Sequence, residues 1–186
     1  LLAVEKNLGS KLLTQESNPR TYWVDTHIAC ATVGYRPDSY AAVLQARKEA
    51  ANFFSTFGCK ITVQELVSRV AHTFHSSHAF SSIRPYGCAL LFGSCLDGPS
   101  LYALEPNGQY FGYFACCFGK NSSLARAELQ RPEYNWSEKT VEEAKPLVEK
   151  IIKELHESQN KTWEIEMIQV CTATEGKPQK SFIENQ

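Results

Sequence analysis

The order of apolar and polar residues along the chain predicts strands first and helices second. The first third is rich in β-branched and aromatic residues and in turn formers, a composition typical of short strands. It contains an apolar run over residues 1–4, a turn-rich stretch over 7–19, and a strand region over 21–33 that ends at Gly34.

Two helices are predicted next. Apolar and alanine residues recur on a broad face between Pro37 and Gly58, and three phenylalanines crowd the last turn, so we expect this face to be buried. A second helix begins at Thr62, where the sequence Thr-Val-Gln-Glu forms a capping box, and its apolar stripe extends toward Ile83. The phenylalanines are Phe53, Phe54 and Phe57.

The second half of the chain follows a similar order. Continuous apolar runs separated by Asp-Gly and Asn-Gly turns predict three strands, and stripes at helical spacing predict two more helices. In a final strand, apolar residues alternate with Glu164 and Glu166, so we expect that strand to have one face in water. The predicted strands cover residues 86–93, 100–104, 109–118 and 163–170, and the predicted helices cover 121–130 and about 139–157.

The element order favours an α+β protein. Blocks of strands separated by pairs of helices argue against alternating βαβ units, and therefore against a doubly wound parallel sheet. Two antiparallel sheets packed face to face, with one helix pair on each outer side, would bury every apolar stripe. The sequence thus predicts a four-layer αββα sandwich, formed as a single domain over residues 1–186.

Composition and charge narrow the functional classes. The 186 residues are 43% hydrophobic and 11% aromatic and carry a net charge of −1, which excludes a disordered chain. Nucleic-acid binders usually have a basic excess, so we expect no nucleic-acid partner. No apolar run approaches about 18 residues, so we expect no membrane partner. The first residue is Leu1, within an apolar run, and we expect the natural N-terminus to precede it.

The cysteines are interpreted as free thiols. Seven is an odd number, the density is below that of a disulfide scaffold, and most have apolar neighbours, so a reducing compartment is favoured over a disulfide framework. Cys116 and Cys117 are adjacent, a spacing that fits neither a zinc knuckle nor a redox turn. The seven are Cys30, Cys59, Cys88, Cys95, Cys116, Cys117 and Cys171.

No local motif predicts catalysis, a metal or a cofactor. His72, His75 and His78 are three residues apart on a predicted helix, where neighbours can share a metal. Over six residues, however, a helix turns by about 600°, which carries the last histidine off the face of the first, so solvated or interface histidines are favoured. Gly-x-Ser-x-Gly is absent, and residues 118–123 lack the first glycine of a phosphate loop.

Three motifs resemble those of proteasome alpha subunits. Residues 82–87 (Ser-Ile-Arg-Pro-Tyr-Gly) resemble their Arg-Pro-aromatic-Gly junction, which follows a long helix. Residues 102–108 (Tyr-Ala-Leu-Glu-Pro-Asn-Gly) resemble their Tyr-x-x-Asp-Pro-Ser-Gly hairpin, with two departures, and residues 115–120 (Ala-Cys-Cys-Phe-Gly-Lys) resemble the strand end before their third helix. Within the family, the chain most resembles the alpha type-3 class, which occupies the seventh position of the ring. This resemblance rests on Glu5-Lys6, Ser17-Asn18 and Val24-Asp25.

The resemblance implies the N-terminal-nucleophile hydrolase fold and a non-catalytic place in the alpha ring of the 20S core particle. Such a subunit contributes to ring assembly, substrate gating and activator docking in ubiquitin-dependent and other intracellular protein degradation, in the cytoplasm and nucleus. Its partners are neighbouring alpha subunits, the beta ring and the tails of regulatory ATPases. The family's gate tail and first helix have no counterpart in this sequence, so no residue here is assigned to gating.

Two other interpretations stay open. Beta subunits of the same fold carry an N-terminal threonine, whose amine serves as the base for its own hydroxyl. A catalytic threonine-type beta subunit, or another N-terminal-nucleophile hydrolase, is therefore the alternative. A stand-alone binding module is the third interpretation, and it predicts a monomer in solution.

The resemblance also implies a binding site for activator tails. In the family, pockets between neighbouring alpha subunits receive these tails, and a basic side chain pairs with the terminal carboxylate. That position falls on Arg20, which can hold a carboxylate bidentately; without the resemblance, an ordinary exposed arginine is favoured. Gly34 and Tyr35 match the glycine and the following residue that line the pocket. Many members have an aliphatic side chain at the second position, so we expect Tyr35 to narrow the pocket.

Overall fold

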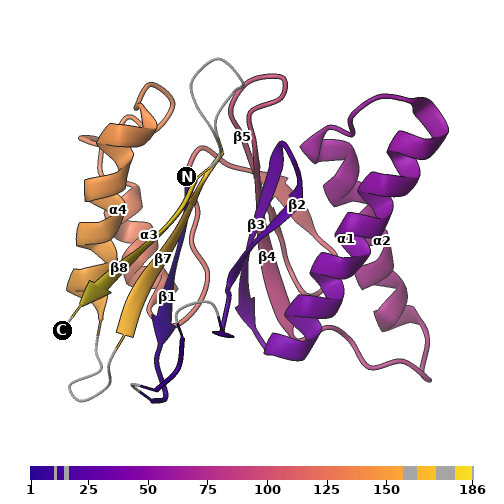
Figure 1. Cartoon of the computed structure of the whole chain (residues 1–186), viewed down its shortest axis with the longest axis horizontal. Helices are drawn as coiled ribbons and strands as arrows, with labels where there is room; N and C mark the ends of the chain where they lie inside the picture. The colour runs from indigo at the N-terminus through magenta and orange to yellow at the C-terminus, as the bar shows by residue number, and fades with distance from the viewer. Residues whose placement is uncertain (11, 15–16, 157–162, 171–178, 186) are drawn as a thin grey trace.

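The chain folds into four layers, in which two antiparallel sheets face each other and a pair of helices lies outside each sheet (Figure 1). The structure is a computed structural model that describes residues 1–10, 12–14, 17–156, 163–170 and 179–185. The αββα sandwich of the α+β class, which the element order predicts, is confirmed.

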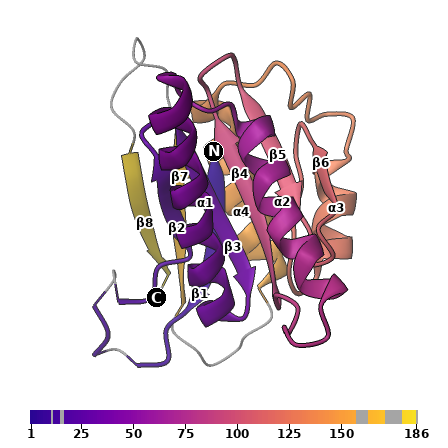
Figure 2. The ribbon, with the colours of Figure 1, turned by 90° about the vertical axis from the view of Figure 1, so that its right-hand side faces the viewer.

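The larger sheet has five antiparallel strands in the order β2-β3-β4-β5-β6. Helices α1 (Arg36–Phe57) and α2 (Val63–Ala79) lie side by side across its outer face (Figure 2). Leu66 and Phe74 of α2 share a fully buried core with Leu90 of the sheet, because the apolar stripe of the helix faces the strands. The strands are β2 (Thr21–Asp25), β3 (Ile28–Gly34), β4 (Cys88–Ser94), β5 (Ser100–Leu104) and β6 (Tyr110–Gly112).

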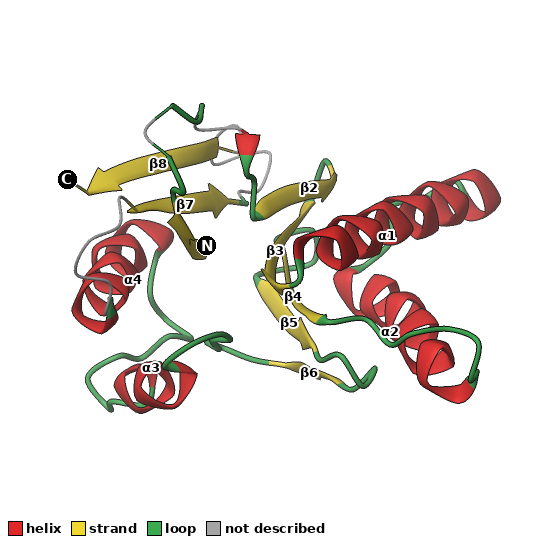
Figure 3. Ribbon diagram, turned by 90° about the horizontal axis from the view of Figure 1, so that it is seen from below, coloured by secondary structure: helices red, strands yellow, loops and turns green. Residues whose placement is uncertain are grey.

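The smaller sheet has three antiparallel strands in the order β1-β7-β8. Helices α3 (Ser122–Leu129) and α4 (Val141–Leu155) lie on the side away from the larger sheet (Figure 3). The α3–α4 layer buries fewer residues than the α1–α2 layer. Among the described residues, α3 contributes no buried residue and α4 contributes only Ile151. The strands are β1 (Leu2–Asn7), β7 (Trp163–Gln169) and β8 (Gln179–Asn185).

The helix boundaries follow from capping residues that the sequence contains. Gly58 ends α1 in the left-handed conformation, with φ of 68°. The hydroxyl of Thr140 accepts the N–H of Glu143 at 3.4 Å, and the Glu143 carboxylate accepts the N–H of Thr140 at 3.1 Å, so α4 begins with a complete capping box. Thr62 likewise accepts the N–H of Glu65 at 3.3 Å at the start of α2.

The helix predictions need two corrections, and one predicted boundary is not tested. Phe54 and Phe57 at the end of α1 are 57% and 59% exposed, so the broad apolar face is only partly buried. Helix α2 ends at Ala79, well before Ile83, because the serines around its end favour turns over helix. The predicted end of the last helix at Glu157 lies outside the described residues. None of the described helices is both long enough and apolar enough to cross a membrane.

The strand predictions were wrong in two places. The strand predicted over 109–118 is regular only in β6, because the apolar residues that follow leave the sheet edge and line a cavity between the layers. The final strand has no wet face, since Glu164 and Glu166 are fully buried. They are buried because ammonium groups face them and because β8, which the sequence did not predict, covers β7 as an outer strand.

Candidate functional site

Arg20, Gly34 and Tyr35 come together where the five-stranded sheet meets the start of α1. Nη1 of Arg20 donates to the carbonyl oxygen of Gly34 at 3.0 Å. Tyr35 follows as the N-cap residue of α1, and its ring is 60% exposed. The structure therefore places the three residues that the sequence resemblance singled out in one exposed cluster.

Gly34 cannot be replaced without disturbing this junction. Its φ is +107°, and a Cβ added there would lie 2.4 Å from the carbonyl oxygen of Gly87. The N–H of Tyr35 also donates to that carbonyl at 2.8 Å. The absence of a side chain at Gly34 thus lets the last residue of β3 pass close to the start of β4 and turn directly into α1.

A second arginine holds the first turn of α1. Both terminal nitrogens of Arg84 donate to the Asp38 carboxylate, at 2.6 and 2.8 Å, and the N–H of Gly87 donates to the same carboxylate at 2.8 Å. The hydrogen bonds from Arg84 hold the pKa of Asp38 below its usual value. The Arg84 guanidinium also lies 5.8 Å from the centre of the Tyr35 ring. The residues of the Arg-Pro-aromatic-Gly motif therefore fix the helix start beside the cluster.

The charges around Arg20, Gly34 and Tyr35 favour binding of an anion. Burial, together with the positive charge of Arg36, lowers the pKa of Arg20, yet a guanidinium stays protonated at neutral pH. Gly34 takes one of the five N–H donors that an arginine offers. The positive end of the α1 dipole lies in the same region. The arrangement suits a carboxylate, which binds to a guanidinium through paired hydrogen bonds.

Two residues that the sequence did not single out, a buried glutamate and a partly exposed lysine, lie behind Arg20. The carboxylate of Glu166, on β7, accepts the backbone N–H of Arg20 at 3.0 Å. Lys180, on β8, lies 2.5 Å from that carboxylate. Because both residues are far from Arg20 in sequence, no local motif could have revealed them.

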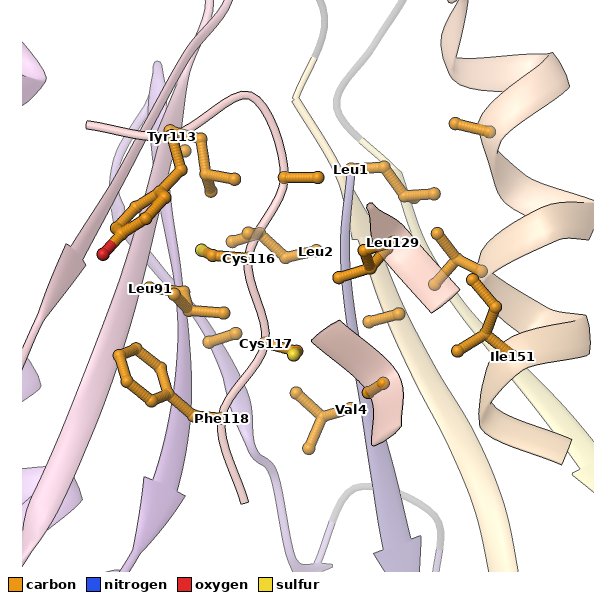
Figure 4. A pocket seen from close by; sticks show the side chains of 18 of the residues that line it. Leu1, Leu2, Val4, Leu91, Tyr113, Cys116, Cys117, Phe118, Leu129 and Ile151 are labelled. Carbon is orange, nitrogen blue, oxygen red and sulfur yellow. The ribbon is translucent and has the colours of Figure 1, made fainter. Parts of the chain in front are cut away.

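A separate cavity of about 640 Å³ lies between the two sheets and α4 (Figure 4). Apolar side chains form most of its wall, among them Leu2, Leu91 and Ile151. The thiols of Cys95, Cys116 and Cys117 also line it, and burial raises the pKa of Cys117 and raises the pKa of Cys116 to about 12. Protonated thiols in an apolar setting are poor nucleophiles, so the cavity has no evident chemistry.

The other residues considered for chemistry lie apart from one another. His72, His75 and His78 are exposed on α2, and a ring nitrogen of His78 lies 2.9 Å from the carbonyl oxygen of Pro106. Within the described ranges, no three His, Cys, Asp or Glu side chains are grouped as a metal would require. Cys171 lies outside the described residues.

The fold is a two-sheet αββα sandwich, and a basic cluster lies at the start of α1. Comparison with known proteins then gives the family, since residues 1–170 match the family described as "Proteasome subunit". The chain belongs to this family, as the sequence motifs indicated.

The relatives to which the chain is similar carry alpha-subunit names. It is 36% identical to "Proteasome subunit alpha type-3" of Dictyostelium discoideum, over 94% of this chain and 70% of the relative. It is 35% identical to the alpha type-3 subunit of Arabidopsis thaliana, over 97% of this chain and 72% of the relative. It is 37% identical to "Probable proteasome subunit alpha type-7" of Schizosaccharomyces pombe, over 95% of this chain and 70% of the relative.

Proposed function

We propose that this chain is a non-catalytic subunit of the alpha ring in a 20S proteasome core particle. In that place it contributes to ring assembly, substrate gating and activator docking during ubiquitin-dependent and other protein degradation in the cytoplasm and nucleus. The observation that carries the proposal is the exposed cluster of Arg20, Gly34 and Tyr35 in a chain similar to alpha subunits over most of its length.

Activator docking follows from the chemistry of the cluster. A polypeptide tail ends in a carboxylate, and the Arg20 guanidinium offers several donors beside the positive end of α1. The exposed side chain of Tyr35 provides an apolar contact for a side chain near the end of the tail. We expect its size to narrow the pocket that the family resemblance implies. The proposed ligand is therefore the C-terminal tail of a regulatory ATPase.

Ring assembly follows from the apolar surface of α1. Tyr40, Leu44, Phe54 and Phe57 are each more than 40% exposed, although large apolar residues are usually covered when they occur together. We infer that subunits of the alpha ring and the adjoining beta ring cover this helix. A chain that stayed monomeric with the other ring subunits present would contradict this part of the proposal.

The direct test replaces Arg20 with alanine in assembled core particles. Losing a charge-assisted hydrogen bond to the tail carboxylate should cost about 1.5–3 kcal/mol, which weakens activator binding roughly ten- to a hundredfold. The measurement is a titration of activator against core particles, with native mass to verify assembly. Arg131→Ala, at an exposed arginine on the α3 side of the molecule, is the control and should bind activator normally. Unchanged affinity for Arg20→Ala would remove Arg20 from the docking site.

A further inference from the structure

Glu166 is a fully buried carboxylate that connects the two sheets directly behind Arg20. Its side chain is 0% exposed, and it reaches from β7 to the start of β2 in the other sheet. Oε2 accepts the N–H of Arg20 at 3.0 Å, while Oε1 accepts the N–H of Thr21 at 3.1 Å and the hydroxyl of Thr21 at 2.6 Å. Three donors from two consecutive residues therefore converge on one carboxylate.

Lys180 pairs with the same carboxylate. Its Nζ lies 2.5 Å from Oε1 of Glu166 and donates to the carbonyl oxygen of Thr21 at 3.1 Å. The Nζ also lies 5.4 Å from the centre of the Phe182 ring, so the ammonium group contacts an aromatic face as well as the carboxylate. Burial disfavours the ionised form of Glu166, but the hydrogen bonds that it accepts outweigh this effect and hold its pKa below the usual value.

Arg20 is held at three points, one of which is the contact with Glu166. Its N–H donates to Glu166, and its carbonyl oxygen accepts the N–H of Thr32 at 2.9 Å and the Thr32 hydroxyl at 3.2 Å. At the far end of the side chain, Nη1 donates to Gly34. The backbone and the tip of Arg20 are thus both fixed, which leaves the guanidinium little freedom to turn away from the start of α1.

A buried ion pair is a poor way to stabilise a fold, because apolar residues of similar size would often do as well. At this position the carboxylate does something that an apolar residue cannot do, since it receives the backbone donors of Arg20 and Thr21. We propose that Glu166 is a positioning residue for the Arg20 cation, and that Lys180 holds Glu166 in place. This inference rests on the proposed docking function.

The test measures how strongly core particles prefer a free carboxylate. The probes are two synthetic peptides with the C-terminal sequence of an activator ATPase, one ending in a carboxylate and the other in a carboxamide. The wild type should bind the carboxylate peptide more tightly, and Arg20→Ala should abolish the preference. Glu166→Gln should reduce the preference by about two- to tenfold, with little change for the carboxamide, because a misplaced guanidinium affects only the charged end.

Glu164→Gln provides a matched control. Glu164 is equally buried on the same strand and is paired with Lys6, which also lies 3.7 Å from Oε2 of Glu166. Arg20 donates to Glu166 and not to Glu164, so this variant should keep most of the preference. Lys180→Met is the second test variant, since Lys180 is 28% exposed and its loss is easier for the fold to tolerate. It should lower the carboxylate preference in the same direction as Glu166→Gln.

The outcomes separate the two proposals. If wild-type particles bind both peptides equally, the docking function proposed for Arg20 is wrong. If Arg20→Ala abolishes the preference while Glu166→Gln and Lys180→Met retain it, docking stands and the positioning role is overturned. If Glu166→Gln fails to assemble, Lys180→Met decides the question alone, because retained preference in that variant also overturns the positioning role.

Discussion

The two halves of the molecule pack their helices very differently, although both helix pairs are amphipathic. In the half formed by the five-stranded sheet, α2 buries Leu66, Val70 and Phe74 completely or nearly so. In the half formed by the three-stranded sheet, α4 buries only Ile151 among its described residues and α3 buries none. An apolar stripe therefore predicts which face of a helix turns toward the sheet. It does not predict how much of that face the sheet buries.

The cavity explains much of this difference. Leu2 and Val4 lie on one face of β1, and Ala3 and Glu5 lie on the other, yet all four line the cavity. The cavity must therefore run along the edge of β1 that does not pair with β7. The smaller sheet has three strands and the larger sheet has five (Figure 3), and residues of α4 line the cavity instead of packing fully on strands. We expect mutations in this half to cost less stability than equivalent mutations in the other.

The largest effect should come from truncating the same residue type in both halves. Leu66→Ala removes a side chain that is 0% exposed within α2, and the resulting void should lower the free energy of unfolding by about 2–5 kcal/mol. Leu155→Ala removes a partly exposed side chain that already borders the cavity in α4, so the loss should stay below about 1.5 kcal/mol. Denaturant unfolding of the purified variants gives both values. Equal losses would show that the halves are packed alike.

A smaller effect should come from two glycines in turns of the five-stranded half. Gly108, with φ of +86°, faces α2 so closely that an added Cβ would lie 2.9 Å from the backbone nitrogen of His75. Gly98, with φ of +102°, has open space at the same position. Both alanine variants carry backbone strain of about 1 kcal/mol, but Gly108→Ala should lose a further 1–2 kcal/mol, roughly, to overlap with the helix. If denaturant unfolding gives the two variants the same stability, the contact between this turn and α2 is looser than the distances indicate.

The sequence predicted the framework because its signals are local. The capping residue Thr62 predicted the start of α2, Gly58 predicted the end of α1, and apolar runs predicted β4 and β5. The order of these elements was enough to predict two sheets between two helix pairs. The strand expected over 109–118 failed because an apolar run does not reveal whether its residues pair in a sheet or line a cavity.

The site was only partly predictable. Arg20, Gly34 and Tyr35 were found through a family resemblance, since an isolated arginine has no pattern of its own. Glu166 was missed because alternation with apolar residues is typical of a solvated face, whereas its partners lie 146 and 145 residues away in sequence. Only the pairing of β7 with β1 and β8 brings opposite charges to that face.

The smallest effect concerns the rates at which cysteine thiols are alkylated. These rates compare the interiors of the two halves without a mutation. Cys30 is fully buried in β3, whereas Cys116 and Cys117 are partly exposed at the cavity. Alkylation requires the thiolate, and burial raises the pKa of all three thiols, so each should react slowly at pH 8 and faster as the pH rises.

Local opening of α3 and α4 should expose the cavity thiols well before global unfolding exposes Cys30. Peptide mapping after iodoacetamide treatment should therefore show Cys59, which is exposed, modified first, the cavity thiols next and Cys30 last. Modification of Cys30 at the rate of Cys116 would mean that the five-stranded half opens as readily as the other.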